Sequence, residues 1–377
     1  MIKVMSIFGT RPEAIKMAPI IQEMEYHKGE IDSVICVTAQ HREMLDSVLD
    51  TFHIVPDYDL NIMKKRQTLD SVTGTILHGL NVILEKEKPD IVLVHGDTTT
   101  TFASALSAFY HKIPVGHVEA GLRTHNLYSP YPEEANRQMV GTIAELHFTP
   151  TMQSLKNLLQ ENKDPEKIYV TGNTAIDALK TTVRKEYDSP ALQWAGDARI
   201  ILLTAHRREN WGAPLKRVFT AVNKITEKYP DARVIYPCHM NPAVRGLADE
   251  MFGNNDHVRV IEPLEVTDFH NLIKKSYLVL TDSGGIQEEG PSLGKPVLVV
   301  RETTERPEGV EAGTLKLVGT STENIVKQVS RLMDDEIEYE RMSKAENPYG
   351  DGHASERIVN AIIRYFRNKD LEEGISA

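Results

Sequence analysis

The stretch that decides the fold is IKVMSIFGTRPEAIKMAPIIQEME, residues 2–25. Its first seven residues are almost continuously apolar, which is typical of a strand buried on both faces of a parallel sheet. A turn at Gly9 follows. A helical period over residues 13–25 then aligns the apolar side chains of Ala14, Met17, Ala18, Ile21 and Met24. The stretch therefore predicts a strand followed directly by an amphipathic helix, which is the repeating unit of a doubly wound α/β sheet.

The same alternation of strand and helix recurs in both halves of the chain. In the first half we expect further strands at residues 33–38, 91–95 and 115–118. The alternation begins again after Tyr187-Asp188-Ser189-Pro190, with strands expected at residues 199–204, 233–236, 258–261, 277–281 and 296–300. Near-continuous apolar strands that alternate with helices predict parallel sheets covered by helices on both faces.

We therefore expect an α/β protein with two doubly wound, Rossmann-like domains that face a cleft. The N-terminal domain is placed at residues 1–180 and the C-terminal domain at residues 190–355. Residues 356–377 are expected to form a packing helix and a tail, because their apolar side chains share one helical face. In such sheets ligands bind beyond the carboxyl ends of the strands, so the residues that follow each strand are the candidates for a site.

Composition limits the partners and the compartment. The chain has 377 residues, with 43 Lys and Arg against 54 Asp and Glu, a formal net charge of −11. This acidic surplus argues against binding nucleic acid or an anionic membrane surface. No apolar run is long enough to span a membrane, and residues 2–8 are too short for a signal peptide. Two cysteines cannot form a disulfide framework, so we expect a cytoplasmic protein.

Charged residues follow the strands of the first half. Arg11 and Lys16 lie near a helix N-terminus, which favours an anion such as phosphate, although residues 9–16 are also ordinary helix-start chemistry. Acidic residues stand at three further strand or helix ends, at Asp97, Glu119 and Glu133-Glu134. Each could serve only as a helix cap or could complement a helix dipole. Three such positions in one half are too many to be explained by capping alone.

The second half carries a different set of residues. His206, Arg207 and Arg208 follow a strand and again indicate an anion. The string DSGGIQEEG, residues 282–290, takes a strand into paired glycines at a helix start, where backbone N–H groups can approach a phosphate closely. An ordinary turn capped by Asp282 or Ser283 is the alternative. Glu289, one turn later, is placed to accept hydrogen bonds from ribose hydroxyls, which favours the nucleotide interpretation.

Several common fingerprints are absent from the sequence. No G-x-G-x-x-G follows a strand, and residues 290–295 lack the spacing of a P-loop, which argues against an NAD-dependent dehydrogenase and a P-loop kinase. No H-E-x-x-H or Cys/His ligand spacing occurs either. A metal-dependent hydrolase built from His95, Asp97, His117 and Glu119 stays open as a rival.

The strings that contain these residues resemble the non-hydrolysing UDP-N-acetylglucosamine 2-epimerases of bacteria over essentially the whole chain. They are GTRPEAIKMAP (9–19), TAQHREMLD (38–46), VHGDTTTTFA (94–103), GHVEAGLRT (116–124), PEEANRQ (132–138), GNTAID (172–177), TAHRREN (204–210), HMNP (239–242) and DSGGIQEEGPSLGKPVLV (282–299). Hydrolysing relatives differ at the loop of residues 9–16, where they carry a G-S-R-A-E-Y type of string. The resemblance implies a glycosyltransferase-B fold.

The resemblance also implies the reaction, a reversible epimerisation of UDP-N-acetylglucosamine to UDP-N-acetylmannosamine at C2. In that scheme UDP is eliminated, a 2-acetamidoglucal forms, and UDP adds back. Neither NAD nor a metal is implied. Carried over by position, the catalytic residues are Asp97, Glu119, Glu133, Arg11, Lys16 and His206. The resemblance adds as substrate-binding residues Leu264, Phe269, Ser283, Gly284, Gly285, Glu289 and Arg306. Which carboxylate removes the proton and which returns it stays open.

Further expectations come from the same resemblance. A second UDP-N-acetylglucosamine would act as an allosteric activator at Gln40, His41, Glu43, Arg66, Glu133, Arg207 and His239. The partners implied are UDP-N-acetylglucosamine, UDP-N-acetylmannosamine, UDP and a second copy of the chain in a homodimer. The product would supply N-acetylmannosamine for cell-surface polysaccharide. A UDP-sugar-dependent glycosyltransferase of the same fold and a non-catalytic sugar-nucleotide sensor are the remaining alternatives.

Overall fold

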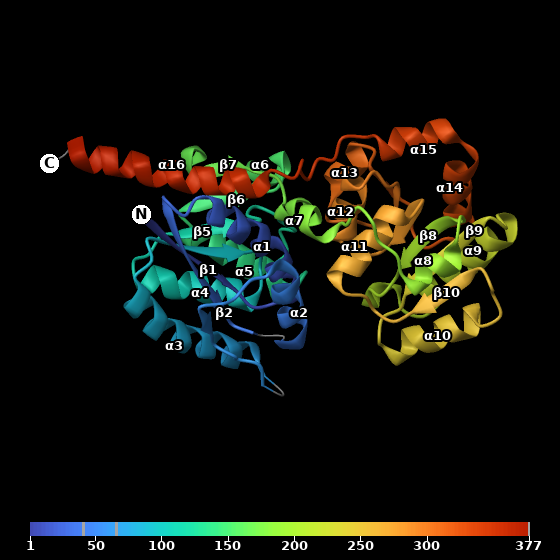
Figure 1. The fold of residues 1–377 in the computed structure, drawn as a ribbon, viewed down its shortest axis with the longest axis horizontal. Helices are drawn as coiled ribbons and strands as arrows, with labels where there is room; N and C mark the ends of the chain where they lie inside the picture. Colours follow the sequence, from blue (N-terminus) through green and yellow to red (C-terminus); the bar gives the residue numbers. More distant parts are fainter. Residues whose placement is uncertain (40–41, 65–66, 376–377) are drawn as a thin grey trace. The chain divides into compact units, whose positions relative to one another are not determined.

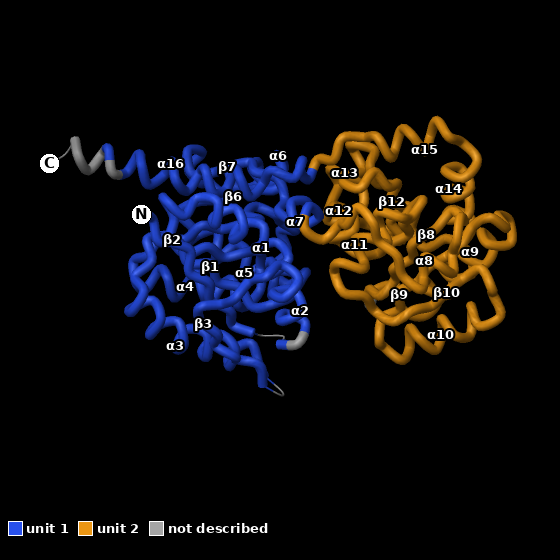
Figure 2. The backbone as a smooth tube through the Cα atoms, in the orientation of Figure 1, with its two compact units in different colours: residues 1–180, 349–377 blue, residues 181–348 orange. Residues whose placement is uncertain are grey.

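The structure is a computed structural model that describes residues 1–39, 42–64 and 67–375, without the side chains at positions 43, 208, 370 and 372–375. The chain divides into two compact units (Figure 2). Unit 1 comprises residues 1–180 and 349–377, and unit 2 comprises residues 181–348. The expected restart of the strand–helix alternation thus corresponds to a second compact unit.

Unit 1 is a parallel sheet with helices on its faces (Figure 1). Its seven strands run in the order β3-β2-β1-β4-β5-β6-β7. The strands are β1 (Ile2–Phe8), β2 (Ile31–Val37), β3 (Tyr58–Asp59), β4 (Ile91–His95), β5 (Val115–Val118), β6 (Leu146–Thr149) and β7 (Ile168–Val170). The helices are α1 (Arg11–Tyr26), α2 (Arg42–Phe52), α3 (Leu69–Glu87), α4 (Thr99–Tyr110), α5 (Glu133–Ile143), α6 (Met152–Gln160), α7 (Thr174–Thr182) and α16 (Ala354–Ile375). The strand order reverses between β1 and β4, which is the position where doubly wound sheets bind ligands.

Unit 2 repeats this plan with a second sheet. Its six strands run in the order β10-β9-β8-β11-β12-β13, so the reversal lies between β8 and β11. The strands are β8 (Arg199–Thr204), β9 (Ala232–Pro237), β10 (Val258–Ile261), β11 (Leu278–Thr281), β12 (Val297–Val299) and β13 (Leu315–Leu317). The helices are α8 (Pro190–Ala195), α9 (Ala213–Lys228), α10 (Pro242–Phe252), α11 (Val266–Lys275), α12 (Ile286–Ser292), α13 (Pro307–Glu311), α14 (Thr322–Asp334) and α15 (Glu336–Ser343). Short 3₁₀ helices lie at Pro165–Lys167 in unit 1 and Arg208–Asn210 in unit 2.

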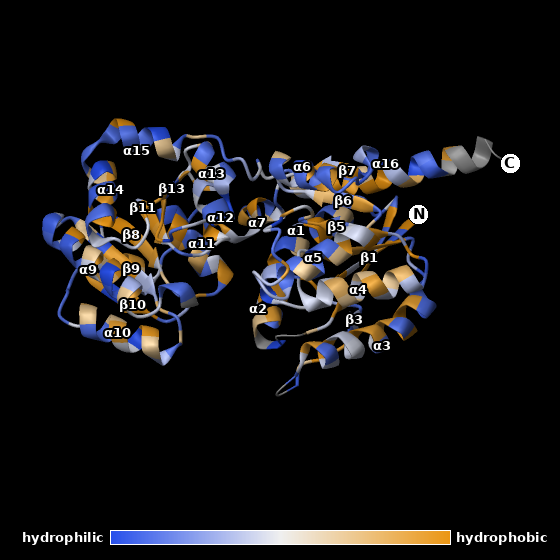
Figure 3. Ribbon diagram, turned by 180° about the vertical axis from the view of Figure 1, so that it is seen from behind, coloured by the Kyte–Doolittle hydropathy of each residue, from blue (hydrophilic) through white to orange (hydrophobic). Residues whose placement is uncertain are grey.

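Each expected strand corresponds to an observed one, whereas the sequence analysis expected no strand at the positions of β3, β6, β7 and β13. Strands β1, β4, β5, β8 and β10 span the expected residues, and the other expected strands differ by one or two residues at an end. Hydrophobic residues are concentrated in the strands and on one side of the helices (Figure 3). The burial pattern explains this agreement, because every residue of β4 and β5 is buried and a continuous apolar run is what such a strand requires. No helix in the described part of the chain has the length and hydrophobicity needed to cross a membrane.

Helix α16 returns the chain to unit 1 after unit 2 is complete. Ile358, Val359, Ile362 and Ile363 are buried in the same hydrophobic core as Val4 of β1. The helix packs against α1 (Figure 1). The amphipathic pattern of residues 356–368 predicts a packing helix, but only the structure shows that α16 packs against α1 and the core of unit 1. Unit 1 is therefore assembled from both ends of the chain.

We expect the Ile362→Ala substitution to lower the free energy of unfolding by about 2–5 kcal/mol, because it leaves a cavity in a fully buried position. Urea unfolding followed by far-UV circular dichroism measures the change. Ile337→Ala, at a residue that is 82% exposed, is the control and should change the free energy by less than about 0.5 kcal/mol. Equal effects of the two substitutions would contradict the packing of α16.

Candidate functional site

The loop that follows β1 is tied to the loop that follows β4 by Glu13. The Glu13 carboxylate accepts hydrogen bonds from the backbone N–H groups of Gly9 (3.1 Å) and Thr10 (2.8 Å). It also accepts from the hydroxyls of Thr98 (2.8 Å) and Thr101 (3.1 Å). The side chain is buried, which raises the pKa of its carboxyl group, and the four hydrogen bonds offset part of its lost hydration. Glu13 therefore positions two of the strand-end loops that carry candidate residues.

Gly9 is required at the end of β1 by a close approach. A Cβ atom at this position would lie 1.9 Å from Thr38 Oγ1 and 2.9 Å from Thr100 Oγ1. The two threonine hydroxyls are themselves hydrogen-bonded at 3.0 Å. A side chain at position 9 would force the loops after β1, β2 and β4 apart, so the glycine keeps three strand ends close together.

Asp97 does not cap α4. Thr98 occupies the N-cap and accepts a hydrogen bond from the Thr101 N–H at 3.1 Å. The Asp97 side chain instead pairs with Arg137 of α5, and its backbone carbonyl accepts from Asn136 Nδ2 at 2.9 Å. The interpretation of Asp97 as a helix cap is therefore wrong, and its carboxylate is held by a buried cation.

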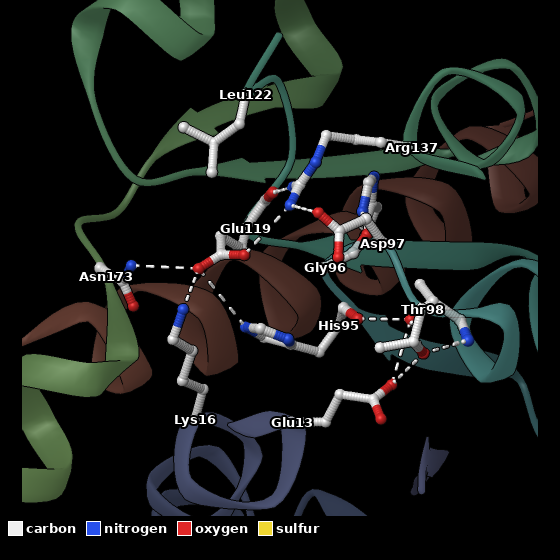
Figure 4. Close-up of polar contacts among 12 residues, drawn as sticks. Glu13, Lys16, His95, Gly96, Asp97, Thr98, Glu119, Leu122, Arg137 and Asn173 are labelled. Atoms are coloured by element: carbon white, nitrogen blue, oxygen red, sulfur yellow. Dashed lines mark hydrogen bonds and ion pairs between the residues drawn. The ribbon is translucent and has the colours of Figure 1, made fainter. Parts of the chain in front are cut away.

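Glu119, directly after β5, lies in the left-handed region with φ +60°. A side chain other than glycine in that conformation is strained, and such strain is concentrated at functional sites. Its Oε1 atom accepts hydrogen bonds from Lys16 Nζ and, at 3.2 Å, from Asn173 Nδ2 (Figure 4). His95 Nε2 is 3.9 Å from the same oxygen. Lys16 comes from α1, His95 ends β4 and Asn173 follows β7, so three separate segments meet at one carboxylate.

Arg137 joins the two carboxylates. Its Nη2 atom hydrogen-bonds to Asp97 Oδ2 and lies 3.4 Å from Glu119 Oε2, and its Nη1 atom donates to the Glu119 backbone carbonyl (Figure 4). Arg137 is only 5% exposed. Asp97, Glu119, Lys16, Arg137, His95 and Asn173 form what we call the carboxylate cluster of unit 1.

Burial and neighbouring charges in the carboxylate cluster shift the pKa values of Glu119 and His95. Burial raises the pKa of Glu119, but the nearby charges of Lys16 and Arg137 outweigh it and hold the pKa well below the ordinary value. Burial lowers the pKa of His95 to about 4, against the opposing charge of Glu119 and with help from the two cations. At neutral pH the cluster therefore contains an ionised Glu119 and a neutral His95.

The other charged candidates of unit 1 lie at the starts of α1 and α5. Glu134 accepts hydrogen bonds from the backbone N–H groups of Thr124 (3.0 Å) and His125 (3.1 Å), so it holds the loop between β5 and α5. Glu133 is the first residue of α5, one turn before Arg137, and no hydrogen bond in the described part of the chain joins it to Asp97 or Glu119. Arg11 is the first residue of α1.

The proposed metal-hydrolase set has different partners in the structure. His117 Nε2 hydrogen-bonds to the Gly96 carbonyl at 2.7 Å. The Glu119 carboxylate is paired with Lys16, and the Asp97 carboxylate is paired with Arg137. No group of three or more His, Cys, Asp or Glu residues that could hold a metal ion occurs within the described ranges. The positive charge beside these carboxylates comes from the chain itself.

In unit 2, Asp282 organises the loops after β8 and β11. Its Oδ2 atom accepts hydrogen bonds from the backbone N–H groups of His206 and Arg207, both at 2.9 Å, and from Asn210 Nδ2 at 3.1 Å. The Asp282 side chain is fully buried. Asp282 does not cap α12, whose N-cap is Gly285. The acidic residue that the sequence placed in a turn thus fixes the position of His206.

His206 lies against a residue that the resemblance assigned to regulation. Its ring stacks on that of His239, with centroids 5.9 Å apart and planes 9° from parallel. His206 Nδ1 is 3.4 Å from Asp282 Oδ1. Arg207 Nη1 is 3.9 Å from Glu305 Oε1. His206, Arg207 and His239 are therefore neighbours.

The glycines after β11 lie beneath two charged side chains. A Cβ atom on Gly284 would be 2.8 Å from Arg306 Nη1, and one on Gly285 would be 3.5 Å from Glu289 Oε1. Arg306 Nε donates to buried Glu288 at 2.6 Å, and Glu289 Oε2 is 3.4 Å from His270 Nε2. Five of the expected residues thus lie in adjacent segments of unit 2: Ser283, Gly284, Gly285, Glu289 and Arg306.

The remaining expected residues are divided between described and undescribed parts of the chain. Phe269 of α11 precedes His270, and Phe269 and Leu264 are partly buried against the same hydrophobic core of unit 2. Gln40, His41 and Arg66 lie outside the described residues, and the side chain of Glu43 is not described.

Sequence reasoning missed several of the residues that hold the candidates in place. Arg137, Asn173 and Glu288 were not selected, and Glu13 and Asp282 were interpreted only as helix-start or turn residues. The only signal in the sequence was a charged or amide residue at a strand end or in the helix that follows the strand. Such residues are too common for this signal to single out these positions. In the sequence, Arg137 is at least 18 positions from its partners and Asn173 is 54 positions from Glu119, so only the fold identifies these pairs.

Comparisons with known proteins give a consistent result. Residues 22–363 match the family model described as UDP-N-acetylglucosamine 2-epimerase. The chain is 62% identical to the UDP-N-acetylglucosamine 2-epimerase of Bacillus subtilis (strain 168), over 97% of this chain and 96% of that protein. The crystal structure of UDP-GlcNAc 2-epimerase from Neisseria meningitidis bound to UDP-GlcNAc is 51% identical, with a TM-score of 0.87 over 96% of this chain and 100% of that one.

A more distant similarity concerns the fold alone. The glycotransferase of kitacinnamycin is 13% identical with a TM-score of 0.64, over 95% of this chain and 98% of that one. Together with the two doubly wound parallel sheets, this similarity confirms the predicted glycosyltransferase-B fold class.

The neutral, buried state of His95 predicts a pH dependence of stability. The pKa of His95 is about 4 in the folded protein against 6.5 ordinarily, so between these values the unfolded chain binds a proton that the folded protein does not. The free energy of unfolding therefore falls as the pH decreases from 6.5 towards 4. We expect His95→Asn to remove up to roughly 3 kcal/mol of this loss.

Urea unfolding of the wild type and His95→Asn at pH 7.5, 6.5, 5.5 and 4.5 measures the difference. His53→Asn, at an exposed histidine, is the control and should follow the wild-type dependence. The same slope in all three proteins would show that His95 does not contribute.

Proposed function

This chain belongs to the UDP-N-acetylglucosamine 2-epimerase family, and from that premise we propose that it interconverts UDP-N-acetylglucosamine and UDP-N-acetylmannosamine through elimination and re-addition of UDP. The observation that carries this proposal is the carboxylate cluster, in which Asp97 and Glu119 are joined by Arg137 beside Lys16. Two carboxylates and two cations are what a proton transfer coupled to the departure of an anion requires.

The chemistry of C2 explains why elimination is needed. Neither ring carbon next to C2 is a carbonyl carbon, so the C2 proton is too weakly acidic to be removed directly. If the C1–O bond to UDP breaks while a carboxylate takes the C2 proton, a C1=C2 double bond forms and 2-acetamidoglucal and UDP result. A proton delivered to the opposite face of C2, with UDP re-added at C1, inverts the centre. The overall change is redox-neutral, so the scheme requires no nicotinamide cofactor, and no step in it requires a metal ion.

We assign the proton transfers to Asp97, Glu119 and Glu133. The ionised state of Glu119 supports its role as a proton acceptor or as a charge that stabilises an electron-poor ring. Asp97 is partly exposed, with 28% of its side-chain area accessible, so a ligand can reach it. Glu133 follows from the family resemblance. We propose that Arg11 and Lys16 stabilise the negative charge that develops on the departing diphosphate.

Residues of unit 2 are proposed to bind UDP. Ser283, Gly284 and Gly285 would contact the diphosphate together with His206 and Arg306, Glu289 would bind the ribose, and Phe269 and the backbone near Leu264 would bind uracil. The guanidinium of Arg306 over Gly284 supports this assignment, because arginine provides bidentate, charge-assisted hydrogen bonds to phosphate oxygens.

Regulation, assembly and cellular role are proposed on the same basis. A second UDP-N-acetylglucosamine is expected to act as activator through Gln40, His41, Glu43, Arg66, Glu133, Arg207 and His239. The stacking of His239 on His206 supports a link between the regulatory and catalytic residues. We expect a homodimer in the cytoplasm, with the two cysteines, both free and buried, in keeping with a reducing compartment. The product would supply N-acetylmannosamine for cell-surface polysaccharide.

Incubation with UDP-N-acetylglucosamine in deuterated water tests the reaction. We expect a second UDP-sugar at constant total UDP-sugar and deuterium at C2 of the recovered substrate, followed by NMR. No exchange without an acceptor would favour a glycosyltransferase or a sensor. Steady accumulation of free UDP that stops on adding a chelator would favour the hydrolase.

The Asp97→Asn substitution should reduce the exchange at least about 100-fold, because an amide cannot take part in the proton transfer. Asp50→Asn, at an exposed position of α2, should exchange at the wild-type rate. The same NMR time course compares the two variants. Undiminished exchange in a folded Asp97→Asn variant would show that Asp97 takes no part in proton transfer.

The Gly284→Ala substitution tests the diphosphate contacts. The new Cβ would lie 2.8 Å from Arg306 Nη1 and must displace the guanidinium. We expect the affinity for UDP to fall about 10- to 100-fold, the cost of losing a charge-assisted hydrogen bond. Isothermal titration calorimetry measures this change. Gly246→Ala in α10, where no atom lies within 4 Å of the new Cβ, should bind UDP like the wild type. Equal affinity in both variants would exclude Gly284 and Arg306 from the UDP site.

A further inference from the structure

We propose that Arg137 is the positioning residue of the carboxylate cluster: it holds the Asp97 and Glu119 side chains at a fixed separation, and catalysis by the pair depends on it. The inference rests on the proposed function, because it adds a residue to that reaction.

The contacts of Arg137 give it this role. One nitrogen, Nη2, hydrogen-bonds to Asp97 and lies 3.4 Å from Glu119 Oε2. The other, Nη1, donates to the backbone carbonyl of Glu119. The guanidinium is planar and rigid, so the three acceptors are fixed relative to one another. It holds both the Glu119 side chain and the strained backbone of the same residue.

The donors around Glu119 require it to be a carboxylate. Lys16 Nζ, Asn173 Nδ2 and Arg137 Nη2 have hydrogen atoms to give and no lone pair to accept one. A proton on Glu119 would face one of these donors. Arg137 is 5% exposed, so water cannot replace its charge if it is removed. The arrangement therefore favours the form of Glu119 that can accept a proton.

Arg137 also relates the pair to the third candidate. It lies in α5, four residues after Glu133, and four residues correspond to about one helical turn. Anchoring Arg137 to Asp97 and Glu119 thus sets the distance of the start of α5 from both. One side chain controls the mutual placement of carboxylates that come from three different segments.

A lysine cannot reproduce these contacts. Its single ammonium group retains the charge but can approach only some of the three acceptors, and it lacks the planar fork. Arg137→Lys therefore separates charge from geometry, whereas Arg137→Gln removes the charge and leaves a side chain that can still form hydrogen bonds.

Steady-state kinetics with UDP-N-acetylglucosamine at pH 5 to 9 test the proposal. For Arg137→Gln we expect kcat to fall about 100-fold or more, KM to change less than about threefold, and the acid limb of the kcat profile to move up by about one pH unit. For Arg137→Lys we expect a fall in kcat of about tenfold and little movement of the acid limb. Wild-type kcat and an unchanged acid limb in either folded variant would overturn the proposal.

Arg123 provides the matched control. Its guanidinium has no exposed side-chain area, donates to both oxygens of Glu161 at 2.6 and 2.9 Å, and also donates to the Leu122 carbonyl at 2.8 Å. Arg123→Gln should lower the thermal midpoint of unfolding as Arg137→Gln does, but leave the acid limb in place. A shift of the acid limb in both variants would assign the effect to structure alone and overturn the proposal.

A titration that needs no substrate separates this proposal from the function. In protein labelled with ¹³C at the glutamate carboxyl groups, the Glu119 signal is identified by its loss in Glu119→Gln. In the wild type it should stay ionised to the lowest pH at which the protein is folded. In Arg137→Lys, which retains the charge, the midpoint should shift little, whereas in Arg137→Gln it should rise. An unchanged midpoint in Arg137→Gln overturns the proposal even if the wild type is an active epimerase. A raised midpoint supports the pairing even if the wild type proves inactive.

Discussion

A buried carboxylate must be compensated by nearby donors, and both units are organised around this constraint. Glu119 is only 8% exposed, and without Lys16, Asn173 and Arg137 its charge would be too costly to bury. Those partners come from α1, from the segment after β7 and from α5. The need to neutralise one charge therefore determines how several loops of unit 1 meet at the carboxyl edge of its sheet.

Unit 2 meets the same constraint with different donors. Asp282 is fully buried at the end of β11, and its Oδ2 atom accepts hydrogen bonds from two backbone N–H groups and the Asn210 amide. Arg306 pairs with Glu288, beside the glycines. Unit 1 thus concentrates paired carboxylates and cations, whereas unit 2 combines glycines, an imidazole and a guanidinium. The difference agrees with the division of labour we propose, proton transfer in unit 1 and nucleotide binding in unit 2.

The formal charge of −11 is uninformative about these local environments. Lys16 and Arg137 surround Glu119, and Arg306 lies over Gly284. A net charge bears on solubility and on long-range attraction, whereas an anionic ligand responds to the groups within a few ångströms. An acidic protein that acts on a nucleotide sugar is therefore physically consistent.

The sequence by itself determined the fold class, most strand positions, the helix start that carries Lys16 and the strand ends at which Asp97, Glu119, His206 and Gly284 stand. This was possible because periodicity records which neighbours along the chain are buried, and because ligands of doubly wound sheets bind after the strands. The tertiary structure alone decided that Thr98 rather than Asp97 caps α4, that α16 belongs to unit 1, and that Arg137 joins Asp97 to Glu119. The two contacts of Arg137 join residues 18 and 40 positions apart. Strand register and loop conformation bring these residues together, and neither leaves a periodic trace in the sequence.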